Sequence, residues 1–198
     1  MTKLAIDDIA DLRAYERERT EFRRDVIELK RRRRVHVGPV VTLLFENRDT
    51  VRFQIQEMAR AERILTDEGI QTELDVYNPL VPEPGHLAAT LFIELTSEEH
   101  LREWLPKLVG IESAIELRMG EPGQQRVIRC EVDPDHLKQL TREEITASVH
   151  YVHFALDAAA VGAFAAGPVT LVVTQPNYPY ETTLGSETVQ ELLADLRG

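Results

Sequence analysis

Apolar and polar residues recur along this chain with two different periods, and each period predicts a type of secondary structure. Phe22, Val26 and Leu29 stand at helical spacing with charged residues between them, which is typical of an amphipathic helix. Strands are expected where apolar residues alternate with polar ones or run together between turn residues. The predicted helices cover residues 6–12, 15–32, 50–67, 70–77 and 186–196, with short helices after Ser97 and Asp157, and the predicted strands cover residues 35–45 (bent at Gly38), 88–95, 114–119, 126–132, 146–156 and 169–174.

About six strands at hairpin-like spacing, interrupted by helices without regular alternation, predict an α+β fold. We expect a largely antiparallel, curved sheet with helices packed on it. A chain of 198 residues can bury a substantial core as one domain. Within that single domain, residues 1–33 are predicted to form an N-terminal helical arm and residues 34–198 the α+β body.

The composition is that of an ordinary globular protein, with 43% hydrophobic and 29% charged residues. The formal net charge of −11 argues against binding to the phosphate backbone of nucleic acid. Cys130 is the only cysteine, which excludes intramolecular disulfides and suits a reducing compartment. No leader-like segment or apolar run of ~18 residues is apparent. These features predict a cytoplasmic protein that binds neither nucleic acid nor membrane.

Positive charge is concentrated in the first third of the chain. Residues 1–60 carry 14 basic and 11 acidic side chains, whereas the remaining residues have a net charge of −14. Arg31, Arg32, Arg33 and Arg34 lie at the expected C-terminal end of a helix, where the helix dipole favours cations. Two other roles stay open for them: contact with an acidic surface of the same or a neighbouring subunit, and binding of a small anion.

Glu62 interrupts the apolar stripe of the helix predicted at residues 50–67. It would share this face with Val51, Ile55, Met58 and Leu65. An ionised carboxylate facing a core costs several kcal/mol unless it is paired, binds a metal or takes up a proton. Glu62 is therefore a candidate for a buried ion pair, for a metal ligand or for a general acid or base.

His150 is the candidate partner of Glu62. Alternation in the strand at residues 146–156 places His150 on the apolar face with Phe154, opposite to Tyr151. Histidine and carboxylate side chains from separate elements can hold a divalent metal such as Fe, Zn or Mn, and Glu57 is a third candidate ligand. A carboxylate can equally hold a core histidine in one tautomer. No His-Glu-x-x-His, paired-cysteine or phosphate-binding glycine motif accompanies these residues.

Two loops, at residues 75–79 and 175–180, gather aromatic and polar side chains that are candidates for the rim of a pocket. They supply Asp75, Tyr77 and Tyr178, and His153 is a fourth candidate. Tyrosines beside prolines also commonly anchor loops, so both roles stay open.

Several ordered segments resemble a known family. They read RV at residues 34–35, VGP at 37–39, LFENR at 44–48, QEMARAE at 56–62 and LDVYNPL at 74–80. On these residues the chain resembles, over nearly its whole length, the uncharacterised bacterial family called domain of unknown function 3501 (DUF3501). The resemblance implies no established activity and no functional residues. The usual gene neighbours of the family, rubrerythrin-like and iron–sulfur proteins, imply a link with redox or metal metabolism.

These features favour a cytoplasmic accessory or metal-associated protein of redox or iron metabolism, with Glu62 and His150 in a partly buried site. We expect a homodimer, and a redox or iron–sulfur protein as its partner. The alternative is an interaction module without catalysis, whose basic N-terminal arm binds an acidic partner surface. A third hypothesis is an enzyme without metal that uses Glu62 as its base.

Overall fold

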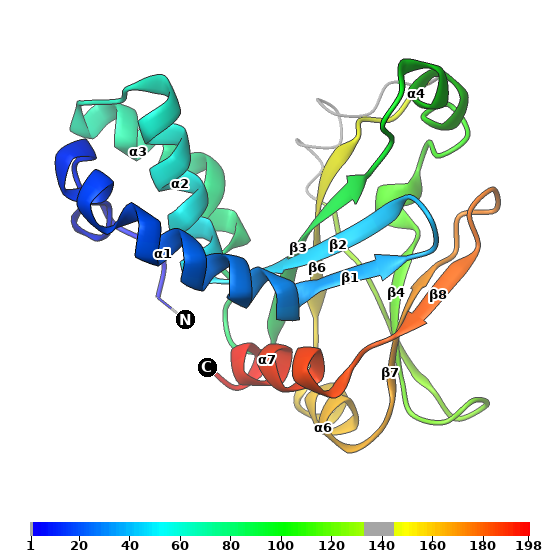
Figure 1. The fold of residues 1–198 in the computed structure, drawn as a ribbon. Helices are drawn as coiled ribbons and strands as arrows, with labels where there is room; N and C mark the ends of the chain where they lie inside the picture. The colour runs from blue at the N-terminus through cyan, green and yellow to red at the C-terminus, as the bar shows by residue number, and fades with distance from the viewer. Residues whose placement is uncertain (1, 133–144) are drawn as a thin grey trace.

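The computed structural model describes residues 2–132 and 145–198 and contains two antiparallel sheets beside a group of helices (Figure 1). The α-helices are α1 (Leu12–Arg33), α2 (Arg48–Glu62), α3 (Asp67–Tyr77), α4 (Glu98–Trp104), α6 (Ala158–Ala166) and α7 (Ser186–Arg197). Short 3-10 helices are η1 (Ile6–Asp8), η2 (Asn78–Leu80) and η3 (Ile111–Ser113). The strands are β1 (Arg34–Val37), β2 (Val41–Glu46), β3 (His86–Ile93), β4 (Ile115–Met119), β5 (Arg126–Arg129), β6 (Val149–Ala155), β7 (Val169–Val173) and β8 (Tyr180–Thr183).

The strands form two four-stranded sheets, a first sheet in the order β1–β2–β3–β6 and a second sheet in the order β5–β4–β7–β8. The predicted α+β class and the antiparallel pairing are confirmed, but the expected single sheet is two sheets. Gly38, with φ of +71°, reverses the chain, so the bent strand predicted at residues 35–45 is the hairpin of β1 and β2. β8 was not among the predicted strands; its sequence YETT has no apolar alternation, and pairing with β7 makes it a strand.

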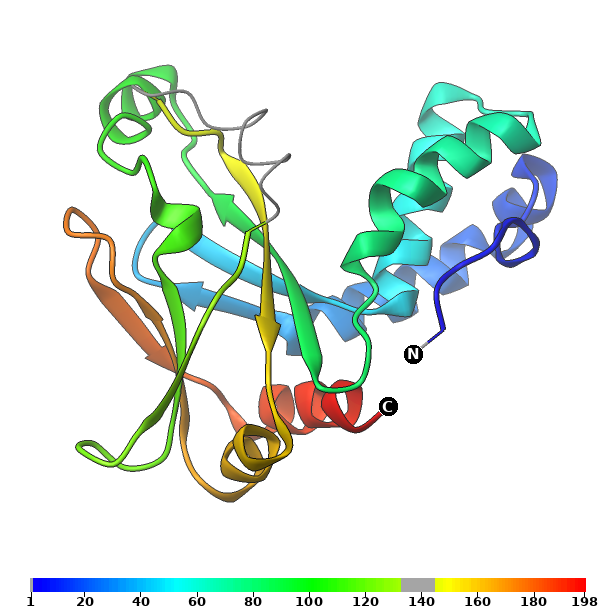
Figure 2. The ribbon, with the colours of Figure 1, turned by 180° about the vertical axis from the view of Figure 1, so that it is seen from behind.

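The two sheets face each other, and the main apolar core lies between them (Figures 1 and 2). They also meet along both edges. At one edge the backbones of Glu131 and His153 exchange two hydrogen bonds, of 2.7 and 2.9 Å, and at the other the Thr182 hydroxyl donates to the carbonyl oxygen of His36 at 2.7 Å.

Helices α1, α2 and α3, here called the helical layer, lie beside the outer face of the first sheet (Figures 1 and 2). A second apolar cluster, which includes Val51, Ile55 and Leu74, joins α2 to α3, and Tyr151 of β6 packs against it. α6 and α7 lie near one end of the two sheets. Within the described residues, no helix combines the length and the apolar composition that crossing a bilayer requires.

α1 corresponds to the predicted N-terminal arm. Asp11 caps it through a hydrogen bond from the backbone N–H of Ala14, and the basic residues of its last turn lie where the helix dipole favours them. Tyr15 and Val26 are buried, and α1 contacts α2, α7 and β2. The division into an arm at residues 1–33 and a body at residues 34–198 of one domain stays a prediction.

Candidate functional site

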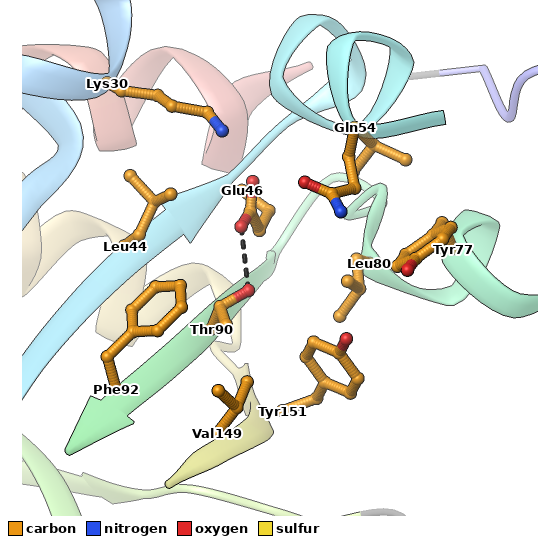
Figure 3. A pocket seen from close by; sticks show the side chains of 11 residues that line it. Lys30, Leu44, Glu46, Gln54, Tyr77, Leu80, Thr90, Phe92, Val149 and Tyr151 are labelled. Atoms are coloured by element: carbon orange, nitrogen blue, oxygen red, sulfur yellow. Dashed lines mark hydrogen bonds between the residues drawn. The ribbon is translucent and has the colours of Figure 1, made fainter. Parts of the chain in front are cut away.

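A pocket of about 250 Å³ lies between the helical layer and the outer face of the first sheet (Figure 3). Its walls come from segments that are far apart in the sequence, so the pocket exists only in the folded protein. The lining residues are Lys30 of α1, Leu44 and Glu46 of β2, Val51 and Gln54 of α2, Tyr77 of α3, Leu80 of η2, Thr90 and Phe92 of β3, and Val149 and Tyr151 of β6.

The strand register aligns three of these side chains across the sheet. Leu44 pairs with Thr90, and Thr90 pairs with Tyr151, so all three lie on the outer face. The residues one position earlier or later in each strand point to the core between the sheets, as Leu43 and Leu91 do. The period of two in each strand therefore separates an outer face of mixed polarity from an apolar inner face.

Glu46, the last residue of β2, brings a buried carboxylate to the pocket and is 8% exposed. One carboxylate oxygen accepts a hydrogen bond from the hydroxyl of Thr50 in the first turn of α2, and the other accepts one from Thr90 at 2.7 Å. The Thr50 hydroxyl is itself fixed, because it accepts a hydrogen bond from the backbone N–H of Asn47. Each carboxylate oxygen thus has one protein donor and retains a lone pair that a ligand can use.

Arg33 holds the end of the strand that carries Glu46. Its buried guanidinium donates to the carbonyl oxygens of Phe45 and Glu46, at 2.9 and 3.1 Å, and to the carboxylate of Asp195 in α7. Arg33 lies one helical turn after Lys30 in α1. The same anchor therefore positions the helix that brings Lys30 to the pocket.

Lys30 extends from α1 toward the space that Glu46 also faces (Figure 3). Burial lowers the pKa of its ammonium group, and Arg34 lowers it further, whereas Glu46 acts in the opposite direction. The Nζ atom lies 5.2 Å from the centre of the Phe53 ring, which favours the cation. Among the described residues the amine has no hydrogen-bond or ion-pair partner.

Two phenols and one amide complete the polar lining. Figure 3 shows Tyr151, Tyr77 and Gln54 around the same space as Glu46. Burial raises the pKa of the Tyr151 hydroxyl, and Tyr77 and Glu46 raise it further, so Tyr151 is a neutral hydrogen-bonding group at pH 7. The pocket therefore combines a cation, an anion and neutral polar groups with an apolar wall, the composition that is common in sites for small organic molecules.

The predicted buried position of Glu62 is wrong. α2 ends at Glu62, and Arg63 has a left-handed conformation with φ of 56°, so the helix stops before Leu65. Glu62 is exposed, and Leu65 is 80% exposed. The predicted apolar stripe included Leu65 only because the helix was expected to continue to residue 67.

His150 is 1% exposed and lies on the inner face of β6, as the alternation predicts. Its Nε2 lies 2.8 Å from the hydroxyl of Thr146 and 2.9 Å from the carbonyl oxygen of Ala147. Burial lowers the pKa of the imidazole, and the charge of Glu112 opposes this change. His150 faces the core between the sheets while Glu62 lies at the exposed end of α2, so the structure does not bring the two together.

Glu57, the third predicted metal ligand, joins α1 to α2. Its carboxylate accepts two hydrogen bonds from Arg19, at 2.7 and 2.8 Å, and one from the Tyr15 hydroxyl at 2.7 Å. Arg19 is the main reason that the pKa of Glu57 is lowered to about 2. Across residues 2–132 and 145–198, no three His, Cys, Asp or Glu side chains form a group that could hold a metal ion.

Of the four predicted rim residues, Tyr77 lines the pocket. Asp75 is exposed and accepts a hydrogen bond from Gln71 at 2.7 Å. Tyr178 is fully buried near the β1–β2 turn, where its hydroxyl donates to the carbonyl oxygen of Val37 at 2.9 Å. His153 lies on β6 beside a separate hollow near the start of β3.

The basic run at residues 31–34 contacts carboxylates of the same chain. Contact with an acidic surface of the same subunit is one of the roles that the sequence left open. The arginines also lie at the C-terminal end of α1, where the helix dipole favours cations. The pairs are Arg31 with Glu28 at 3.2 Å, Arg32 with Glu191 at 2.6 Å, Arg33 with Asp195, and Arg34 with Glu94 at 3.1 Å.

Sequence reasoning did not single out Lys30, Glu46, Thr90 and Tyr151 as a site. Lys30 was part of the basic run, and Glu46 ended an apolar strand. A usable signal was present in the polar residues at alternate positions of the strands that became β2 and β3. That these strand residues line the same pocket as Lys30 of α1 depends on the tertiary structure.

Comparison with known proteins supports the family resemblance. A family described as "Protein of unknown function (DUF3501)" matches residues 3–196. The chain is also similar to a "novel protein of unknown function" from Burkholderia pseudomallei K96243, known from a crystal structure at 1.90 Å resolution. The two chains are 36% identical with a TM-score of 0.89, over 98% of this chain and 100% of that one. A search of curated proteins finds no match.

Proposed function

We propose a function from the pocket itself, because the chain belongs to DUF3501, a family of proteins of unknown function. The protein binds a small organic acid between the helical layer and the outer face of the first sheet. One observation carries this proposal: the Lys30 amine, which has no hydrogen-bond or ion-pair partner among the described residues, lines the same pocket as the buried carboxylate of Glu46.

The charges in the pocket define the ligand. A carboxylate near Lys30 would form a charge-assisted hydrogen bond and would offset the desolvation of the ammonium group. Glu46 repels a second anionic group and favours a hydroxyl or amino group at its end of the pocket. Leu44 and Phe92 offer an apolar wall for the carbon skeleton. A volume of about 250 Å³ suits a small metabolite better than a nucleotide.

The hypotheses based on other residues have less support. The metal-associated hypothesis relied on Glu62, His150 and Glu57, which have different surroundings and belong to no group of three ligand-type side chains that could hold a metal ion in the described part of the chain. The hypothesis of an interaction module relied on the arginines at residues 31–34. These arginines form ion pairs with carboxylates of their own chain. The homodimer, the cytoplasmic location and the redox or iron–sulfur partner stay predictions.

Thermal unfolding in the presence of a panel of small acids tests the proposal. The panel contains monocarboxylates, hydroxy acids, oxo acids and amino acids, each paired with its neutral amide. Because a ligand that binds the folded state raises the unfolding temperature, we expect at least one acid, but not its amide, to stabilise the wild type. We expect Lys30→Met to abolish this shift.

The matched control is Arg24→Met, which removes a cation from an exposed position of the same helix. This variant should keep the full shift. A panel without any stabilising acid, or a shift of equal size in the Lys30→Met variant, would contradict the proposed function.

A further inference from the structure

On the basis of the proposed function, we infer that Lys30 forms an imine with a carbonyl group of the ligand, which makes the ligand a small oxo acid. The geometry behind this inference is an amine that lines the pocket, extends toward the same space as a buried carboxylate and has the apolar side chains of Leu44 and Phe92 on its side of the pocket (Figure 3). Lysines that form imines are typically held in such partly desolvated surroundings.

The surroundings favour the neutral, nucleophilic form of the amine. Leu44 and Phe92 line the pocket beside Lys30, and burial on this side lowers the pKa of the ammonium group. Arg34 acts in the same direction, whereas the negative charge of Glu46 opposes it. Tyr77 and Tyr151, on the facing elements, contribute hydroxyl groups.

The reaction needs no reagent besides the ligand. The nitrogen lone pair of neutral Lys30 attacks the carbonyl carbon, a C–N bond forms, and the electron pair of the C=O π bond moves to oxygen, which takes up a proton. The nitrogen then loses a proton, the carbinol hydroxyl gains one and leaves as water as the C–O bond breaks, and the nitrogen lone pair forms the C=N bond. An amine, a carbonyl compound and one proton, which the ammonium form of Lys30 supplies when it becomes neutral, thus give a protonated imine and one water. Glu46 can accept the proton from nitrogen and return it to the departing hydroxyl.

A carboxylate beside the carbonyl group keeps the charge balance of the pocket. Before the reaction it pairs with the ammonium form of Lys30, and afterwards it lies next to the protonated imine. The positive charge at this position is therefore paired with the ligand in both states. This is the reason to expect an oxo acid and not a simple aldehyde.

Other lysines of the described chain lack these surroundings. Lys3 donates to the backbone carbonyl oxygens of Asn78 and Val81, at 3.0 and 2.7 Å. Lys107 forms an exposed ion pair with Glu103 at 2.7 Å. Lys138 lies outside the described residues. Lys30 alone among the described lysines lines the pocket.

Reductive trapping tests the inference. The full-length protein is incubated with pyruvate or glyoxylate and sodium cyanoborohydride, and the product is studied by intact mass spectrometry and peptide mapping. We expect one adduct, with the mass of the oxo acid less one oxygen atom, located at Lys30. Lys30→Arg should abolish this adduct while keeping the positive charge, and Glu46→Gln should slow its formation by about 10²-fold.

The control Lys107→Arg removes an exposed lysine and should leave trapping unchanged. The inference is overturned by an adduct spread evenly over the lysines, by trapping that persists in Lys30→Arg, or by the absence of an adduct with both oxo acids. Stabilisation by acids without trapping would refute the imine and leave the proposed function in place. Absence of both stabilisation and trapping would refute both.

Discussion

The two faces of the first sheet come from alternate residues of the same strands, yet their surroundings differ. The inner face packs against a second sheet, and Leu43, Leu91 and Phe154 are fully buried there. The outer face meets helices, which leave the pocket beside Glu46 between themselves and the twisted sheet. A site is therefore expected where two different kinds of layer meet and not where two sheets interlock.

Polar residues on the two faces show what this difference means. His150 on the inner face is held by Thr146 and by the backbone of Ala147, as a core histidine usually is. Lys30 of α1, which lines the pocket at the outer face, has no such partner among the described residues. A buried polar group whose hydrogen bonds are made within the protein is therefore weak evidence for a functional site. A partly buried polar group that lines a pocket and has no hydrogen-bond partner is stronger evidence.

The largest expected effect concerns the inner face. Phe154→Ala removes a fully buried ring that lies 6.3 Å from the ring of Phe45, and we expect it to lower the free energy of unfolding by about 4 kcal/mol. Phe92→Ala on the outer face should cost less, about 1–2 kcal/mol, because that ring is partly exposed. Urea denaturation measures both. Equal losses would show that the two faces are packed alike.

The next effect concerns the attachment of α1 to α2. Glu57→Gln weakens the contacts with Arg19 and Tyr15 and should cost about 2 kcal/mol at pH 7. The folded-state pKa of Glu57 is lowered from 4.5 to about 2, so its contribution is present above pH 4.5 and is lost as the pH falls toward 2. Urea denaturation between pH 7 and pH 2 should show this part of the acid dependence in the wild type. If the Glu57→Gln variant lost stability with falling pH as the wild type does, the assignment of this acid dependence to Glu57 would be wrong.

A smaller effect separates stability from binding on the outer face. Thr90→Val removes the hydroxyl that donates to Glu46 at 2.7 Å and should cost about 1 kcal/mol, while reducing stabilisation by the acid found in the panel. Thr42→Val is the matched control, because the buried Thr42 hydroxyl donates to Glu94 at 2.8 Å outside the pocket. Thermal unfolding with and without the acid distinguishes them. A similar loss of ligand effect in both variants would argue against Glu46 as a binding group.

The smallest effect is expected at Glu62. Glu62→Gln should change the free energy of unfolding by less than about 0.5 kcal/mol, because the side chain is exposed at the end of α2. Removing its charge also relieves Glu73, whose pKa is raised by burial and by Glu62. Urea denaturation and metal analysis by mass spectrometry should give the same values as for the wild type. A clear loss of stability or of bound metal would restore Glu62 as a site residue.

Much of the fold followed from local patterns. The alternation of β6, the cationic end of α1 and the hairpin of β4 and β5 depend on residues close together in sequence, and they were predicted. The end of α2 was missed because Arg63, not a glycine, adopts the left-handed conformation there. Within the site, Tyr77 was predicted from its loop, whereas the role of Glu46 was not.

By itself, the sequence determined the fold class, the antiparallel pairing, the buried face of β6 and the family. Periodicity, turns and caps act over a few residues, so the chain carries that information locally. Only the tertiary structure decided that the strands divide into two sheets and that Lys30, Glu46 and Tyr151 meet in one pocket. The meeting of these three residues in one pocket depends on the register of the strands and on the packing of the helices against a twisted sheet. No short segment of the sequence specifies the register or the packing.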